Sequence, residues 1–204
     1  MKIGIVIPYR GTNAGKSRLR ESMDEESVKK ILSKMTQHVI TEVMKVGMEL
    51  NLYILTRKSD VLFDGKFQIC KDEGRNLNDS LKKFTAEMEE DIIMVLMADL
   101  PLIKHTHIEA IVKSVNRENN VVVAPAGDNG TSILCFNRST NFPFFYGKNS
   151  ALKFANYIKK AGINNLILET NHCYQDIDTL KDLKNLNHSN YLPKWLKSYI
   201  KEVL

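Results

Sequence analysis

Short apolar runs alternate along the chain with longer stretches in which apolar residues recur every three or four positions. The most apolar run covers 92–98 with seven consecutive apolar residues, too few for a helix buried on every side and typical of one central strand. A strand that is apolar on both faces belongs in a parallel sheet covered by helices. Further strands are predicted at 2–8, 51–56, 66–70, 120–125, 131–136 and 165–169.

Helical spacing fills most of the intervals between these strands. In the stretch 25–48, Val28, Ile31, Met35 and Val39 recur three or four positions apart, as on the buried face of a helix. The predicted helices are 25–48, 80–90, 105–117, 149–161, 179–183 and 193–204. This alternation predicts an α/β fold with a mainly parallel sheet flanked by helices. Because no change of composition divides the chain, we expect residues 1–204 to form a single domain.

Composition and charge narrow the range of functions. The chain has 204 residues, of which 43% are hydrophobic, and a formal net charge of +5. Charges of both signs are interspersed, which argues against a nucleic-acid-binding tail, and a mild basic excess suits an enzyme of anionic, phosphorylated substrates. The three cysteines are widely spaced, so neither a disulfide framework nor a zinc site is indicated. No signal-peptide pattern and no apolar run near the ~20 residues of a membrane span occur, so we expect a soluble, cytoplasmic protein.

The loop after the first predicted strand carries groups that suit phosphate binding. Gly11 and Gly15 let the backbone approach a ligand closely, and Arg10, Lys16 and Arg18 supply positive charge. The spacing matches neither a Walker loop nor a G-x-G-x-x-G fingerprint. From the residues alone, this segment is either a phosphate-binding loop or an ordinary solvated one.

Aspartates follow the central strand and a late, short segment. Asp99 comes directly after the run 92–98, and open α/β sheets bind ligands beyond the carboxyl ends of their strands. Asp176 and Asp178 are two positions apart, which on extended backbone directs both carboxylates to one face. Carboxylates and substrate phosphates are the usual ligands of Mg²⁺. The alternatives are a cap or turn role for Asp99 and a helix cap for the Asp-x-Asp pair.

Two loops contain small and hydroxyl-bearing residues. Thr131 in 130–132, and Gly147 and Ser150 in 146–150, suit donation of hydrogen bonds to a carboxylate or phosphate, although a plain turn or helix cap explains them equally well. Asp128 lies in a loop that turn chemistry explains. His105 lies at a predicted helix start without a third metal ligand nearby in sequence, so a capping or surface role is expected.

Taken together, these motifs resemble the 2-phospho-L-lactate guanylyltransferases. The matching segments, in the order of that family, are 7–10, 16–19, 97–102, 130–131, 146–150 and 176–183. The resemblance implies a Rossmann-like sheet related to the nucleotide-diphospho-sugar transferases. It also implies an enzyme of coenzyme F-420 biosynthesis that joins GTP to 2-phospho-L-lactate, or to phosphoenolpyruvate in some members, and releases pyrophosphate. Such an enzyme is expected to use Mg²⁺ and to form a homodimer.

Position by position, the resemblance implies four sets of site residues. The catalytic residues would be Lys16, Arg18 and Asp99, with Lys16 and Arg18 on the GTP phosphates. The remaining nucleotide contacts would be Arg10, Gly11 and Asn78. The Mg²⁺ ligands would be Asp99, Asp176 and Asp178. The contacts to the phospho-acid acceptor would be Thr131, Gly147 and Ser150.

This sequence departs from the family pattern around the acceptor. Ser132 stands where Asn is frequent, Asp128 and Asn129 stand where glycines are common, and Gln175 stands where a hydroxyl residue is frequent. These departures bear on the identity of the acceptor more than on nucleotidyl transfer. Two other functions stay open, namely a nucleotidyltransferase with a sugar-phosphate or molybdopterin acceptor and a non-catalytic nucleotide-binding module.

Overall fold

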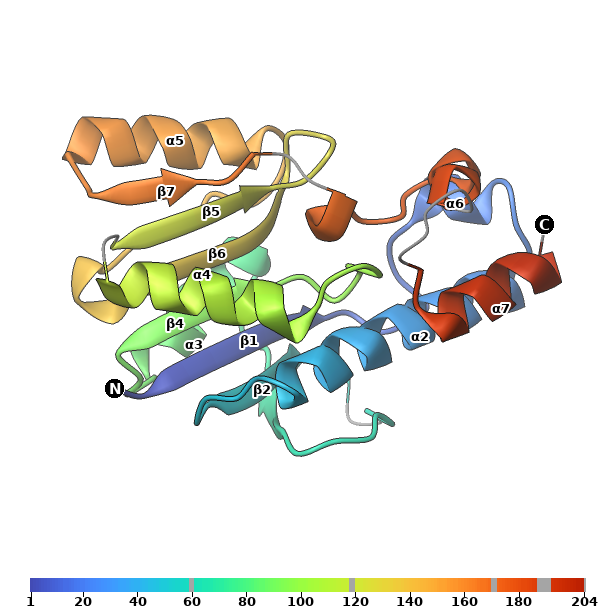
Figure 1. The fold of residues 1–204 in the computed structure, drawn as a ribbon, viewed down its shortest axis with the longest axis horizontal. Helices are drawn as coiled ribbons and strands as arrows, with labels where there is room; N and C mark the ends of the chain where they lie inside the picture. The colour runs from blue at the N-terminus through green and yellow to red at the C-terminus, as the bar shows by residue number, and fades with distance from the viewer. Residues whose placement is uncertain (59–60, 118–119, 170–171, 187–191, 204) are drawn as a thin grey trace.

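A computed structural model describes the chain except for residues 59–60, 118–119, 170–171, 187–191 and 204. Its centre is a seven-stranded sheet with the order β3-β2-β1-β4-β6-β5-β7 (Figure 1). The strands are β1 Ile3–Tyr9, β2 Asn51–Thr56, β3 Gln68–Lys71, β4 Ile92–Leu96, β5 Val121–Pro125, β6 Thr131–Asn137 and β7 Asn165–Ile167. Each lies at or within two residues of a predicted strand.

The sheet is mainly parallel, as the sequence predicts. β1 pairs in parallel with both β2 and β4, and β5 pairs in parallel with β7. β6 is antiparallel to both of its neighbours, because it returns from β5 through a tight hairpin. In that hairpin the Ala126 N–H donates to the Gly130 carbonyl at 3.1 Å, and Asn129 has a φ of 64°. The sequence Asp128-Asn129-Gly130 is typical of such a turn, so these residues indicate a hairpin that the prediction from the apolar runs did not take into account.

The helices lie close to their predicted positions. They are α1 Ser17–Arg20, α2 Glu25–Met44, α3 Leu77–Ala86, α4 His105–Arg117, α5 Ser150–Ala161, α6 Leu180–Leu186 and α7 Lys194–Val203, with 3-10 turns η1 Arg138–Thr140 and η2 His172–Tyr174. α3 starts before the predicted residue 80 because the Asn76 side chain caps it, accepting from the Asp79 N–H at 3.1 Å. The short helix α1 falls in a segment predicted to be loop. Within the described residues, no helix combines the length and apolarity that crossing a membrane requires.

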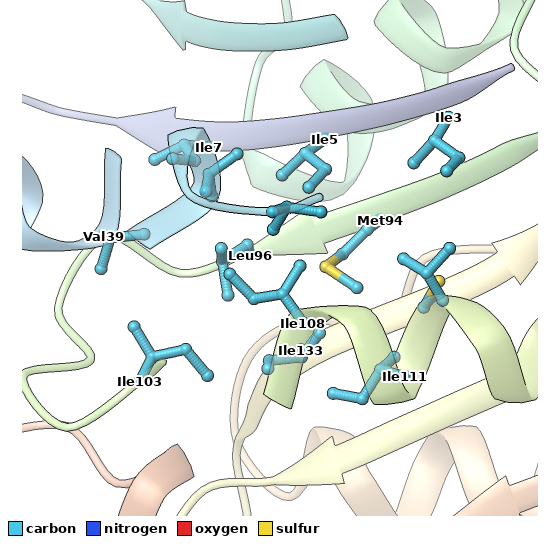
Figure 2. Close-up of a cluster of buried hydrophobic side chains, with 14 of the residues drawn as sticks. Ile3, Ile5, Ile7, Val39, Met94, Leu96, Ile103, Ile108, Ile111 and Ile133 are labelled. Carbon is cyan, nitrogen blue, oxygen red and sulfur yellow. The ribbon is translucent and has the colours of Figure 1, made fainter. Parts of the chain in front are cut away.

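Both faces of the sheet are buried. On β1, Ile3, Ile5 and Ile7 point to one face, where they pack with residues of α2 and α4 (Figure 2). Val6 points to the opposite face and packs in a second cluster that includes Leu81 of α3 and residues of α5. Because side chains alternate along a strand, this two-sided burial requires the uninterrupted apolar runs from which the strands are predicted.

A third apolar cluster lies beyond the sheet, where α6 and α7 meet α1 and the N-terminal half of α2 (Figure 1). Leu19 of α1, Ile177 and Leu196 are all fully buried in it. The Tyr199 hydroxyl of α7 donates to the Ser27 carbonyl of α2 at 2.8 Å. The C-terminal helix therefore closes a core of its own, and this core contains residues adjacent in sequence to the predicted site.

Candidate active site

The central feature of the site is one lysine among three aspartates. The Nζ atom of Lys16 lies 2.6 Å from Asp99 Oδ2, 2.9 Å from Asp176 Oδ2 and 2.5 Å from Asp178 Oδ1. The second oxygen of Asp178 lies 2.6 Å from Nη2 of Arg18. Lys16 lies in the loop after β1, Arg18 in α1, Asp99 in the loop after β4, and the other two aspartates in the segment before α6. Residues separated by more than 150 positions in the chain thus meet at the carboxyl ends of the central strands.

Buried apolar neighbours bring these charged groups together. Leu19 follows Lys16 and Arg18, Ile177 stands between Asp176 and Asp178, and both are fully buried in the third cluster. Lys16 has a left-handed backbone with a φ of 53°. This conformation is uncommon for a residue with a side chain, and the packing of the following turn holds it in place. Burial of Leu19 and Ile177 therefore sets the position of the charges on either side of them.

The electrostatics of the cluster reflect an excess of acid. Burial would lower the pKa of Lys16, but attraction to Asp99, Asp176 and Asp178 outweighs it and raises that pKa well above its usual range. Burial raises the pKa of Asp176 to about 6 against the opposing charge of Lys16, and repulsion by Asp99 adds to the rise. Burial also acts to raise the pKa of Asp178, but Lys16 outweighs it and that pKa is lowered. Three acids face two bases, so the cluster retains negative charge.

The donor chemistry of this cluster fits a hard divalent cation. Carboxylate oxygens are the preferred ligands of Mg²⁺, and the three aspartates already direct oxygens at one positive charge, the Lys16 ammonium. As the described residues are arranged, no group of three or more His, Cys, Asp or Glu side chains forms a ready metal site. In this structure the ammonium of Lys16 takes the position at which the oxygens converge.

A cleft of about 510 Å³ opens beside the cluster, at the ends of β1, β2 and the residues after β3. Its charged lining residues are Arg10, Arg57, Lys58, Arg75 and Asp72. The excess of basic side chains suits an anionic ligand such as a nucleoside triphosphate. Arg10 was expected to contact the nucleotide. Arg57, Lys58 and Asp72 were missed, although they follow strands and the rule that singled out Asp99 also applies to them.

Gly11 and Asn78 lie next to this cleft in different roles. Gly11 has a φ of 84°, and a Cβ there would lie 3.0 Å from the Lys58 side chain, so the position favours glycine. The Asn78 amide donates to the Tyr146 carbonyl at 3.0 Å, and its oxygen accepts from the Tyr146 N–H at 2.7 Å. The Asn78 side chain therefore ties α3 to the loop before α5.

The two predicted hydroxyl loops meet on the other side of the cluster. The hydroxyls of Thr131 and Ser150 are buried and lie 2.8 Å apart, and the Ala151 N–H donates to the Asn129 carbonyl at 3.1 Å. The backbone of Gly147 accepts from the Ser150 N–H at 3.1 Å. The structure thus brings Thr131, Gly147 and Ser150 together, and one of the two hydroxyls donates a hydrogen bond to the other. Ser132 donates to the carbonyl of Tyr174.

A second cavity, of about 560 Å³, lies between α2, the loop before α4 and the start of α7. Its charged centre is Glu42, which accepts from Lys45 Nζ at 2.6 Å and from the His105 N–H at 3.0 Å, with His105 Nδ1 at 3.1 Å. Burial acts to raise the pKa of Glu42, but these donors outweigh it and lower the pKa to about 2. This carboxylate, and not the His105 side chain, caps the start of α4.

Comparison with known proteins is consistent with this geometry. Residues 3–203 match the family model described as "Guanylyl transferase CofC like". A 2-phospho-L-lactate guanylyltransferase from Methanocaldococcus sp. (strain FS406-22) is 29% identical over 95% of this chain and 86% of its own length. A phosphoenolpyruvate guanylyltransferase from Thermobaculum terrenum is 24% identical over 91% of this chain and 83% of its own.

Solved structures share the fold. A protein from Desulfovibrio desulfuricans G20, assigned as a nucleotide-diphospho-sugar transferase, superposes with a TM-score of 0.82 and covers 98% of this chain and 94% of its own. Its sequence identity is 14%, so the likeness concerns the fold alone. The expectation of a sheet related to that of the nucleotide-diphospho-sugar transferases is confirmed.

Proposed function

The chain belongs to the CofC-like guanylyl transferase family, and we propose that it transfers GMP from GTP to 2-phospho-L-lactate or phosphoenolpyruvate with release of pyrophosphate. Guanylyl transfer is a nucleotidyl transfer, so the protein is an enzyme of that class. A place in coenzyme F-420 biosynthesis follows for a product of this kind.

The observation that carries the proposal is the order of groups along one edge of the sheet. The basic cleft lies at the ends of β1 and β2, the Lys16 cluster lies at the ends of β1 and β4, and the loops of Thr131 and Ser150 flank β5 and β6. A nucleotide in the cleft and an acceptor beside the hydroxyl loops would place the reacting phosphates over the cluster. Holding two reactants in line supplies much of the lowering of a phosphoryl-transfer barrier.

In the proposed reaction an oxygen of the acceptor phosphate attacks the α-phosphorus of GTP, and the bond to the bridging oxygen of pyrophosphate breaks. No proton has to be removed, because a phosphate dianion is already a nucleophile. Lys16 and Arg18 would donate to phosphate oxygens and stabilise the charge that develops on the leaving pyrophosphate. Asp99, Asp176 and Asp178 would hold Mg²⁺. When bound, this ion would neutralise charge on the two phosphates that must approach each other.

A substrate panel tests the proposal. Pyrophosphate release is measured with GTP, CTP and ATP, each offered with 2-phospho-L-lactate, phosphoenolpyruvate and a sugar 1-phosphate, in Mg²⁺ and in excess chelator. We expect product only with GTP and a phospho-acid, and only with the metal. Turnover restricted to the sugar phosphate would assign a different acceptor class. GTP binding without product from any acceptor would identify a non-catalytic nucleotide-binding module.

We also propose that the protein is a homodimer, as the family resemblance implies. Support comes from exposed apolar side chains on the successive elements α5 and β7, where Leu152, Leu166 and Ile167 are 59%, 39% and 40% exposed. Exposed apolar side chains are a common feature of association sites. Sedimentation equilibrium should give a mass near twice that of the chain, and Leu166→Lys should shift it toward the monomer.

A further inference from the structure

The cleft at the ends of β1 and β2 contains a single acid among basic residues. Of the described residues that line it, Asp72 is the only carboxylate, and it lies with Arg10, Arg57, Lys58 and Arg75. Basic side chains are suited to phosphates, whereas a carboxylate repels them. The presence of Asp72 in this cleft therefore requires either a structural reason or a ligand group that donates hydrogen bonds.

The carboxylate is held in a fixed position. Its Oδ1 accepts from the Gly74 N–H at 2.9 Å, its Oδ2 lies 3.5 Å from Arg57 Nε, and its own N–H donates to the Thr56 carbonyl at 2.8 Å. A Cβ at Gly74 would clash with the backbone of Ser80, so the loop packs directly on α3. Each oxygen has one partner and can accept another hydrogen bond. The Asp72 side chain is 21% exposed, so a ligand can reach it.

Hydrogen-bonding chemistry distinguishes the nucleobases at such a group. Guanine presents two adjacent donors on its Watson–Crick edge, N1–H and the N2 amino group, which match the two oxygens of a carboxylate. Adenine and cytosine present an acceptor at the ring nitrogen of that edge, which a carboxylate repels. An acceptor-only group therefore selects guanine and rejects the other two bases.

We propose that Asp72 is the residue that selects guanine, by accepting hydrogen bonds from N1–H and N2 of the base. This inference rests on the proposed function in that it takes the cleft as the nucleotide site of a guanylyl transferase. Arg57 and the Gly74 N–H are positioning groups that hold the carboxylate. A purely structural Asp72 would instead serve only to fix the loop 72–76.

The test is Asp72→Asn, measured against bases that differ only at the edge in question. Binding of GTP, ITP and XTP is measured without acceptor, and kcat/KM is measured with phospho-acid. An Asn keeps an acceptor for N1–H and adds a donor that matches the O2 of xanthine. We expect about a 100-fold loss with GTP, a gain with XTP, and loss of the wild-type preference for GTP over ITP, which lacks the N2 amino group.

Glu73→Gln is the matched control, because it removes the adjacent carboxylate, which pairs with Lys71 and does not line the cleft. This variant should keep the wild-type ratios. An equal loss of GTP, ITP and XTP in Asp72→Asn, or unchanged ratios, would overturn the assignment and leave the proposed reaction standing. GTP-selective binding that depends on Asp72, with no product from any acceptor, would overturn the reaction and leave the assignment standing.

Discussion

Two partly buried clusters of charged groups in this protein differ in which kind of group is in excess. Around Lys16 three carboxylates surround one ammonium, whereas around Glu42 a lysine, a backbone N–H and an imidazole surround one carboxylate. Burial raises the pKa of Asp176 to about 6, and the excess of acid adds to this rise. The excess of donors around Glu42 lowers its pKa to about 2.

We propose that this difference separates a reactive site, around Lys16, from a structural one, around Glu42. Both oxygens of Glu42 have partners in the protein, and its hydrogen bond from the His105 N–H stabilises the start of α4. The cluster of Lys16 retains negative charge at the carboxyl ends of the strands, where a cation and phosphates could be bound. Cavity size would have indicated the Glu42 cluster instead, because the larger of the two cavities, of about 560 Å³, adjoins that cluster.

Asp99→Asn should produce the largest effect, because it removes one charge from the unbalanced cluster without changing side-chain volume. We expect kcat/KM for pyrophosphate release to fall by about 10³-fold or more, the usual scale for loss of a charged group that acts on the transition state. Circular dichroism and thermal unfolding should show an intact fold. Turnover within about tenfold of the wild type would remove Asp99 from the catalytic machinery.

Ile177→Ala sharpens the comparison by loosening the Asp176–Asp178 segment without altering a charge. Ile177 is fully buried in the third cluster. The cavity left should lower the free energy of unfolding by about 3 kcal/mol, measured by urea denaturation. Activity should fall as well, because the carboxylates lose the anchor between them. Leu62→Ala is the control, since Leu62 is 90% exposed, and it should change neither quantity.

Glu42→Gln should produce the smallest effect and the opposite pattern, with stability lost and catalysis retained. The variant should be less stable by about 1–2 kcal/mol at neutral pH, since the hydrogen bonds of Glu42 to Lys45 and His105 lose their charge assistance. Its kcat/KM should equal that of the wild type. A fall in kcat/KM without a change in stability would mean that the second cluster also serves catalysis.

The pH dependence of the Glu42 contribution follows from its lowered pKa. The folded-state pKa, about 2, lies below the ordinary value of 4.5, so the stabilisation is complete above pH 4.5 and is lost as the pH falls toward 2. The difference in unfolding free energy between wild type and Glu42→Gln should therefore vanish near pH 2. Asp176 has the opposite sign, because its folded-state pKa is raised and its ionisation opposes folding as the pH rises.

Much of the site could be predicted from the sequence. Asp99 directly follows the apolar run 92–98, whereas the site roles of Lys16, Arg18, Asp176 and Asp178 were implied by the family resemblance. The structure brings all five side chains together. The residues that line the cleft were predicted less completely from the sequence. Arg57 and Asp72 follow short strands, and only the pairing of β2 with β1 and β3 shows that their ends border one cleft.

The sequence by itself determined the alternation of strands and helices, and hence the α/β class, because two-sided burial demands apolar runs with a recognisable period. It also determined which acids and bases stand at the ends of strands. Only the tertiary structure decided that α7 closes a third core over α1 and that Lys16 is the partner of the three aspartates. These outcomes depend on contacts between segments far apart in the chain, such as Lys16 and Asp176, whose pairing no local period encodes.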